Sequence, residues 1–115
     1  MRRSAWYAVT AYSFPNASDP ALKRDIRPLP GRALDTVERL APIEFRWKKS
    51  PDGGRLHNGF SATDVRDVFG ADHGAWMSGP DDNRPTGVCY NELTEVLWRA
   101  VQELADEVKE LRARK

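Results

Sequence analysis

The strongest hydrophobic pattern in the chain lies near its C-terminal end. Residues 91–114 contain no glycine or proline and are rich in residues that favour helices. Apolar side chains recur there every three or four positions, at Leu93, Leu97, Val101, Leu104, Val108 and Leu111. From Leu97 onward the spacing is that of a heptad, with valine at position a and leucine at position d. The pattern predicts a long helix whose last five apolar residues form a coiled-coil seam. The alternative is an amphipathic helix that packs on its own domain.

The residues beside this seam bear on how many helices it joins. Valine at a with leucine at d permits dimers. Ala100 at position g and Ala105 at position e widen the apolar face, which suits three helices better. The same heptad places Glu107 at g and Arg112 at e, so these side chains are expected to pair between neighbouring parallel helices. The last turns lie beyond every other core-forming segment, which favours assembly over packing within one chain.

The first 42 residues predict a strand, a loop and a helix. Aromatic and β-branched residues predict a strand at 5–14, and the four prolines of 15–31 predict a loop. Apolar positions at helical spacing predict a helix over 34–41, which Pro42 ends.

The middle of the chain predicts a hairpin and a short helix. Residues 43–48 alternate apolar and charged side chains, a pattern typical of a half-buried strand. A turn signal at 51–54 predicts that the chain returns as a second strand at 55–60. Residues 62–69 can form a helix, and Gly70 is well placed to end it.

Between this helix and the C-terminal one, residues 71–86 are rich in glycine, proline and aspartate and are expected to be a loop. Trp76 and Met77 within it are expected to anchor the loop by packing, and residues 88–90 to form a short strand. The predicted fold class is therefore α+β: a small sheet with short helices and a long C-terminal helix that forms a trimeric coiled coil.

Composition narrows the possible partners. With 115 residues the chain is one domain by length. Its net charge of +1 favours neither nucleic acid nor an anionic membrane as a partner. No apolar run is long enough to span a bilayer. The single Cys89 excludes an internal disulfide and is expected to be a packed thiol. A chain this small buries modest apolar area, so self-association would help to stabilise it.

No metal site or cofactor is expected. His57 and His73 lie sixteen residues apart with no cysteine pair nearby. Asp72 and the pair Asp81-Asp82 lack the spacing of an EF-hand. The sequence contains no P-loop and no dinucleotide-binding motif.

The candidate chemistry lies in a turn-forming segment near the N-terminus, where Ser18 and Lys23 stand five residues apart. A serine hydroxyl is a poor nucleophile until a base takes its proton, and a lysine can be that base if burial keeps its amine neutral. The alternative is an ordinary solvated loop.

Five segments repeat the order of a known pattern: Ser18–Ile26, Ala33–Leu40, Ala41–Lys48, Gly59–Val65, and the charged helix after Tyr90. Together they resemble the intramolecular chaperone domain of bacteriophage tailspikes and tail fibres, the endosialidase-type chaperone or peptidase S74 family. The resemblance covers roughly residues 12 to 112. The chain departs from the family where Ala21 replaces the usual arginine, where Pro20 stiffens the motif, and where Thr63-Asp64 replaces Gln-Glu.

The resemblance implies a homotrimer and a self-cleaving pair, with Ser18 as nucleophile and Lys23 as base. The scissile bond would be Ala17-Ser18, which divides an upstream stub, 1–17, from a chaperone domain, 18–115. It also implies an upstream tail-fibre segment or other tail proteins as partners, and a place in the virion tail fibre after assembly in the host cytoplasm. The alternative is a trimeric module that stays uncleaved at the fibre tip and contacts a host-surface receptor.

Overall fold

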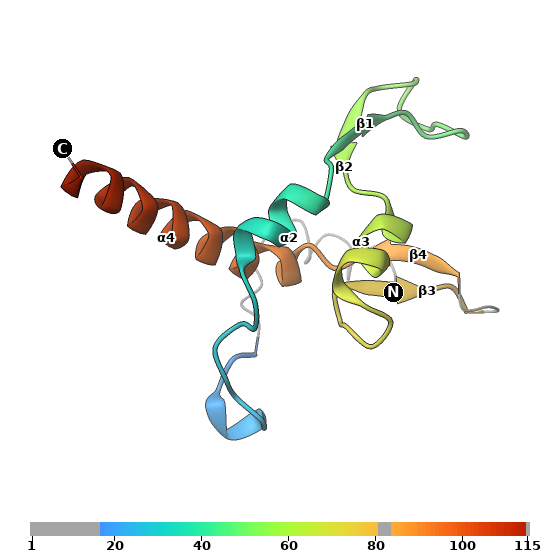
Figure 1. The fold of residues 1–115 in the computed structure, drawn as a ribbon. Coiled ribbons are helices and arrows are strands. Elements are labelled where there is room, and N and C mark those ends of the chain that lie inside the picture. Colours follow the sequence, from blue (N-terminus) through green and yellow to red (C-terminus); the bar gives the residue numbers. More distant parts are fainter. Residues whose placement is uncertain (1–16, 81–83, 115) are drawn as a thin grey trace.

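The computed structural model describes residues 17–80 and 84–114, and the strand predicted at 5–14 lies outside them (Figure 1). The fold is α+β, with short helices, two small antiparallel sheets and a long C-terminal helix. In chain order the elements are the 3-10 helix η1 (Pro20–Leu22), α2 (Ala33–Arg39), β1 (Ile43–Phe45), β2 (His57–Gly59), α3 (Ala62–Phe69), β3 (Trp76–Ser78), β4 (Pro85–Val88) and α4 (Asn91–Ala113).

The predicted small sheet is two separate hairpins. β1 and β2 pair antiparallel, with Ile43 opposite Gly59, as the turn signal between them predicts. β3 and β4 form the second hairpin, with Trp76 opposite Val88. This second hairpin corrects the sequence-based expectation of a loop at 71–86. The glycines and prolines there mark the ends of short strands, whose pairing comes from tertiary contacts that local propensity does not reveal.

α3 begins and ends as the sequence predicts. Ser61 occupies the N-cap position, although its side chain makes no capping hydrogen bond. Gly70 ends the helix with a φ of 103°, and its N–H donates to the carbonyl of Arg66 at 2.7 Å. Residues with a side chain rarely adopt that backbone conformation, which explains why glycine stands there.

Six hydrophobic side chains are buried in the described part of the chain, and they form two small clusters. The first joins α2 to α4 and contains Ala33, Leu34 and Ala100, with Val37 and Val96 beside them. The second lies where α3, β3 and α4 meet and contains Val65, Ala75 and Leu93, packed by Leu40, Phe60, Phe69, Trp76 and Val88. So small a core leaves much apolar surface uncovered in the single chain.

The molecule is extended, with principal dimensions of 60 × 39 × 32 Å. α2 packs along the first part of α4, and the second part of α4 projects away from the body (Figure 1). The β1–β2 hairpin projects in another direction, and residues 17–31 form an arm that leaves the body just before α2 (Figure 1). The β3–β4 hairpin packs against α3.

Candidate functional site

Residues 18–23 fold into one tight turn on the arm. The Asp19 side chain caps η1, since its Oδ1 accepts a hydrogen bond from the backbone N–H of Ala21 at 2.9 Å. Pro20 begins the turn, where its fixed φ suits the helical backbone and its missing N–H is no loss. The backbone N–H of Lys23 closes the turn by donating to the Pro20 carbonyl at 3.0 Å.

This turn brings the two candidate catalytic side chains together. The Nζ of Lys23 donates a hydrogen bond to the Oγ of Ser18 over 2.8 Å. A serine hydroxyl at this distance can pass its proton to the amine once the amine is neutral. Ala17, whose carbonyl the hydroxyl would attack, directly precedes Ser18 on the same arm. The contact therefore comes from local backbone geometry and needs no distant part of the fold.

The surroundings of the pair are open to solvent. Ser18 and Lys23 are both exposed. Lys23 stands at the edge of an open cleft of about 450 Å³, between the arm and α2, α3 and α4, whose lining includes His73 and Glu92. A neutral lysine is favoured by removal from water. The single chain therefore supplies the contact between the two side chains but does not supply the desolvation of the amine.

Apolar side chains beside the pair are also uncovered. Leu22 is 77% exposed and Ile26 is 68% exposed, and both lie on the arm. Burial of either side chain against another surface would lower the free energy of the system. The arm thus carries two uncovered apolar side chains close in sequence to Ser18 and Lys23.

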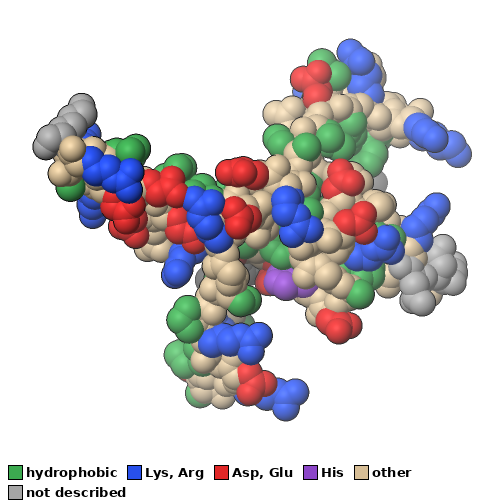
Figure 2. Space-filling view, viewed as in Figure 1, with side chains coloured by type: hydrophobic (Ala, Val, Ile, Leu, Met, Phe, Trp, Pro, Cys, Tyr) green, Lys and Arg blue, Asp and Glu red, His purple; other side chains and the backbone are tan. Residues whose placement is uncertain are grey.

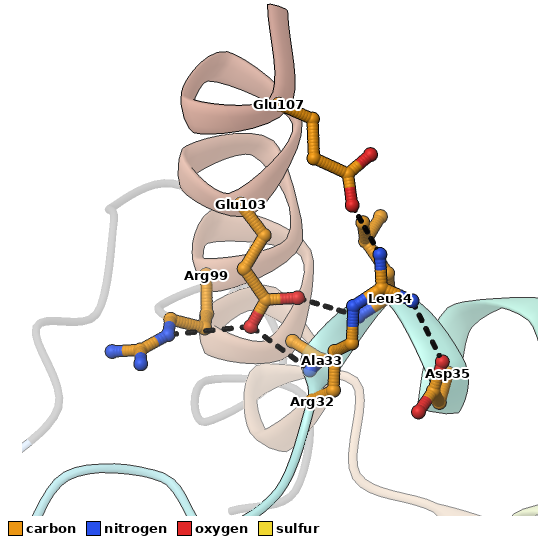
Figure 3. A network of polar contacts seen from close by, with 7 residues as sticks. All are labelled: Arg32, Ala33, Leu34, Asp35, Arg99, Glu103 and Glu107. Carbon is orange, nitrogen blue, oxygen red and sulfur yellow. Dashed lines mark hydrogen bonds and ion pairs between the residues drawn. The ribbon is translucent and has the colours of Figure 1, made fainter. Parts of the chain in front are cut away.

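The arm is joined to the C-terminal helix by a polar network at the start of α2 (Figure 3). The two carboxylate oxygens of Glu103 accept hydrogen bonds from the backbone N–H groups of Ala33 and Leu34, at 3.1 and 2.9 Å. These bonds satisfy donors that a helix start leaves unpaired. They also hold the pKa of Glu103 below its ordinary value, the bond from Leu34 contributing most.

A second carboxylate of α4 completes this network (Figure 3). Glu107 is ion-paired with Arg32, which also contacts Asp35 at 3.0 Å. The hydrogen bond to Glu107 is the main cause that raises the pKa of Arg32. The sequence did not predict this pair within one chain, and the pairing of Glu107 with Arg112 of a neighbour stays a prediction. Ala100 is buried under α2, so it does not widen the open apolar face as its heptad position suggests.

The five predicted seam residues lie on an exposed face of α4. Their exposed fractions run from 45% at Val108 to 64% at Val101. Figure 2 shows apolar and charged side chains side by side along the projecting helix. The structure thus leaves the seam uncovered by the described part of the chain. The members of this face are Leu97, Val101, Leu104, Val108 and Leu111.

The turn between β1 and β2 holds a polar network that the sequence analysis missed. Asp52 accepts hydrogen bonds from the Ser50 hydroxyl and from the backbone N–H of Gly54, the latter at 3.1 Å, and contacts His57 Nε2 at 2.6 Å. The bonds with Ser50 and then His57 lower the pKa of Asp52 to about 2. An aspartate two residues before a glycine in a turn is a signal from which this network could have been predicted.

The contacts and exposure of the other side chains singled out from the sequence are as follows. Trp76 is half-buried, and its indole N–H donates to the Gly70 carbonyl at 3.0 Å, which confirms it as a packing residue, while Met77 is exposed. His57 belongs to the hairpin network, and His73 is exposed. Across the described residues, no helix is long and apolar enough to cross a membrane.

Comparison with known proteins gives one family. Residues 18–74, about half of the chain, match the family model of peptidase S74, the chaperone of endosialidase. This match begins at Ser18 and includes the turn, α2, the β1–β2 hairpin and α3. It confirms the resemblance found in the sequence and supports a chaperone role. No curated protein and no solved structure gives a significant match to the chain.

Proposed function

From the membership of residues 18–74 in the endosialidase-chaperone family, we propose that the chain is the C-terminal intramolecular chaperone of a phage tail fibre or tailspike. It joins three chains through α4 and then releases itself by cleavage of the Ala17-Ser18 bond. Its partners are two further copies and the upstream fibre segment or other tail proteins. It acts in the host cytoplasm during assembly, at the end of a virion tail fibre.

The observation that carries self-cleavage is the 2.8 Å contact between Lys23 Nζ and Ser18 Oγ. In the first step, neutral Lys23 takes the hydroxyl proton, Oγ bonds to the Ala17 carbonyl carbon, and the C–N bond of Ala17-Ser18 breaks. The Ser18 nitrogen takes the proton back from Lys23. Water then cleaves the resulting ester, which frees the Ala17 carboxylate and restores the Ser18 hydroxyl.

Assembly supplies what the single chain lacks at this site. The exposed seam of α4 favours association with further copies. The exposed Leu22 and Ile26 on the arm offer an apolar surface that a neighbouring copy can cover. Covering the arm removes Lys23 from water and favours its neutral form. Cleavage then follows only after the chains have assembled.

The physics of fibres explains the use of such a device. Intertwined β-structure folds through non-local pairing, which is slow and exposes surfaces that aggregate. A C-terminal module that trimerises first aligns the three chains. Its later release leaves a fibre that cannot retrace its assembly, so the stability of the fibre becomes kinetic.

A second candidate is a trimeric module that is never cleaved, stays at the fibre tip and contacts the host surface. The exposure of Lys23 favours it, because an amine left in water is a poor base. In this reading the contact between Ser18 and Lys23 is an ordinary surface hydrogen bond.

Intact mass over time, measured on the whole chain, separates the two candidates. We expect the wild type to lose the 1–17 fragment, and Ser18→Ala, Lys23→Ala and Lys23→Arg to remain whole. Arginine keeps the positive charge but cannot serve as a base, so it isolates the proton-transfer role. Lys49→Ala, at an exposed lysine far from the arm in the sequence, is the matched control and should cleave normally. A wild type that assembles but stays intact would establish the uncleaved module.

A further inference from the structure

α4 presents two different surfaces on the two sides of its seam. On the g side, α2 packs against Ala100 and the network of Figure 3 engages Glu107. On the opposite, e side, the side chains of Trp98, Ala105 and Arg112 are exposed. A neighbouring parallel helix brings its own e side against this g side, because g and e positions face each other across a coiled-coil seam.

Trp98 is the most exposed large apolar residue of α4, at 69%. In its own chain it borders a shallow open groove with Leu29, Glu95 and Gln102, on the side of the helix away from α2. A tryptophan is costly to leave in water and is common among the residues that dominate binding energy at interfaces. Its exposure in the single chain therefore calls for a partner.

A small apolar pocket lies on the other side of the seam. It measures about 60 Å³ and sits where α2 and α3 meet the start of α4. Apart from Thr36, its lining is apolar, and includes Val37, Leu40, Phe60, Phe69, Leu93 and Leu97. The volume suits the edge of an aromatic ring better than a whole side chain. Trp98 of the same chain lies on the opposite side of the seam from α2 and so does not fill it.

The heptad register places Trp98 of a neighbour beside this pocket. In a parallel coil, a g residue faces the e residue five positions later on the next helix. Leu93 at g, which lines the pocket, therefore faces Trp98 of the neighbour. The e side of the seam carries Trp98 and the g side carries the pocket. The contact therefore repeats in one direction around the assembly and closes as a ring.

The two following pairs in the same register are also matched. Ala105 of a neighbour faces Ala100, where α2 already covers the helix and only a small side chain can approach closely. Arg112 of a neighbour faces Glu107, which has opposite charge and whose contact with Arg32 uses Oε1. A carboxylate has two oxygens and can accept from two guanidinium groups. Apolar, small and charged positions thus agree along three successive heptads of the interface.

We infer that each copy inserts the ring edge of its Trp98 into the pocket formed by α2, α3 and the start of α4 of the next copy. The occupant of this pocket is a second copy of the chain, and Trp98 is the anchor that sets the register of assembly. The inference rests on the proposed trimer, and adds to it the residue and the surface that recognise each other.

Photo-crosslinking tests the contact directly. The aromatic photo-crosslinker p-benzoylphenylalanine replaces Trp98 in the full chain, and light and isotope-labelled chains are mixed before irradiation. We expect cross-links between copies to peptides that contain Val37, Leu40 or Phe60. The same crosslinker at Gln102, an exposed position on α4, is the control and should not reach that pocket.

Sedimentation equilibrium supplies the second measurement. Trp98→Ala should weaken association of the chains by ~30-fold or more, as expected for an anchor residue, whereas Trp98→Phe should retain most of the association. Trp47→Ala changes a tryptophan that is 57% exposed and lies between β1 and β2, so it should leave association unchanged. Assembly that survives Trp98→Ala, or cross-links that fall elsewhere, would overturn this inference while leaving the trimer intact. A wild type that stays monomeric would reject the proposed trimer as well.

Discussion

Gly59 stands where the structure leaves no room for a side chain. It is buried at the end of β2, and a Cβ there would lie 2.7 Å from the Tyr90 hydroxyl and 3.2 Å from the Phe45 ring. The same hydroxyl accepts a hydrogen bond from the backbone N–H of Phe60 at 3.1 Å. This glycine therefore lets the hairpin approach the start of α4.

Gly59→Ala is expected to destabilise the fold by about 1–3 kcal/mol, because the added methyl group displaces the Tyr90 hydroxyl or strains the hairpin. Denaturant unfolding measures the change. In a Tyr90→Phe background the hydroxyl is gone, so the cost of Gly59→Ala should fall by about 1 kcal/mol. Equal costs in both backgrounds would show that the hydroxyl is not the obstacle.

At the scale of single residues, the sequence indicated which side chains form the candidate site better than it indicated how exposed those side chains are. The pairing of Ser18 with Lys23 was implied by the family resemblance and not by their spacing alone, and the contact between them lies within one local turn. The exposure of Lys23 could not be predicted, because burial depends on which distant segments cover the arm. The close approach of the second hairpin strand to Tyr90 could not be predicted either, because the hydrogen bond between Phe60 and the Tyr90 hydroxyl joins residues thirty positions apart.

At the scale of elements, α2 depends on a carboxylate from another helix. It has seven residues and no side-chain cap of its own, so its first N–H groups rely on Glu103 of α4. A helix this short has little stability by itself. The docking of α2, and with it the direction in which the arm leaves the body, therefore rests on this contact.

Glu103→Ala should loosen α2 while leaving α4 helical. Hydrogen exchange at the amides of Ala33 and Leu34 should become several-fold faster, because both lose their acceptor. Glu103→Gln, which keeps one acceptor oxygen, should have a smaller effect. Glu110→Ala, at an exposed glutamate of the same helix, is the matched control. Unchanged exchange in Glu103→Ala would show that packing alone holds α2.

The same contact has a predictable pH dependence. The pKa of Glu103 is lower in the fold than in an unfolded chain, so its charged form favours the fold. This contribution is complete above the ordinary range of a glutamate pKa and is lost as the pH falls through the lowered value. The wild-type amides of Ala33 and Leu34 should therefore lose protection in acid, whereas those of the Gln variant should change less.

Elements with a strong period were predicted well, and elements held by tertiary pairing were not. The limits of α3 and α4 follow the hydrophobic spacing and Gly70 closely. The β3–β4 hairpin was expected to be a loop, because its strands are short and lie among glycines and prolines. Its stability comes from the buried Ala75 and from packing on α3, neither of which the local sequence reveals.

At the scale of the whole molecule, the small core and the exposed seam favour assembly. Leu104 is a seam residue with 48% exposure. Leu104→Glu should prevent association through repulsion between carboxylates in the seam, and should leave the fold of each chain intact.

Sedimentation velocity measures this outcome. In a Ser18→Ala background, where the proposed cleavage cannot remove residues 1–17, the otherwise wild-type chain is expected at three times the chain mass of 13.0 kDa, and Leu104→Glu at the mass of one chain. Gln102→Glu adds the same charge at an exposed position outside the seam and should remain assembled. If Leu104→Glu still forms trimers, another surface holds the chains together.

The overall architecture could be predicted only in part. The α+β class, the hairpin at residues 43–60 and the long final helix follow from the sequence pattern. The placement of α2 against α4 does not, because it depends on two carboxylates of a helix about seventy residues away.

The tight turn at residues 18–23 has a consequence for when the reaction can happen. Its hydrogen bonds all lie within six consecutive residues, so the nucleophile and the base can meet before the rest of the chain has folded. Their meeting therefore cannot report that folding is complete. If the chain cuts itself, the delay between synthesis and cleavage is set by the time taken to dehydrate one amine, and that time shortens as the concentration of chains rises.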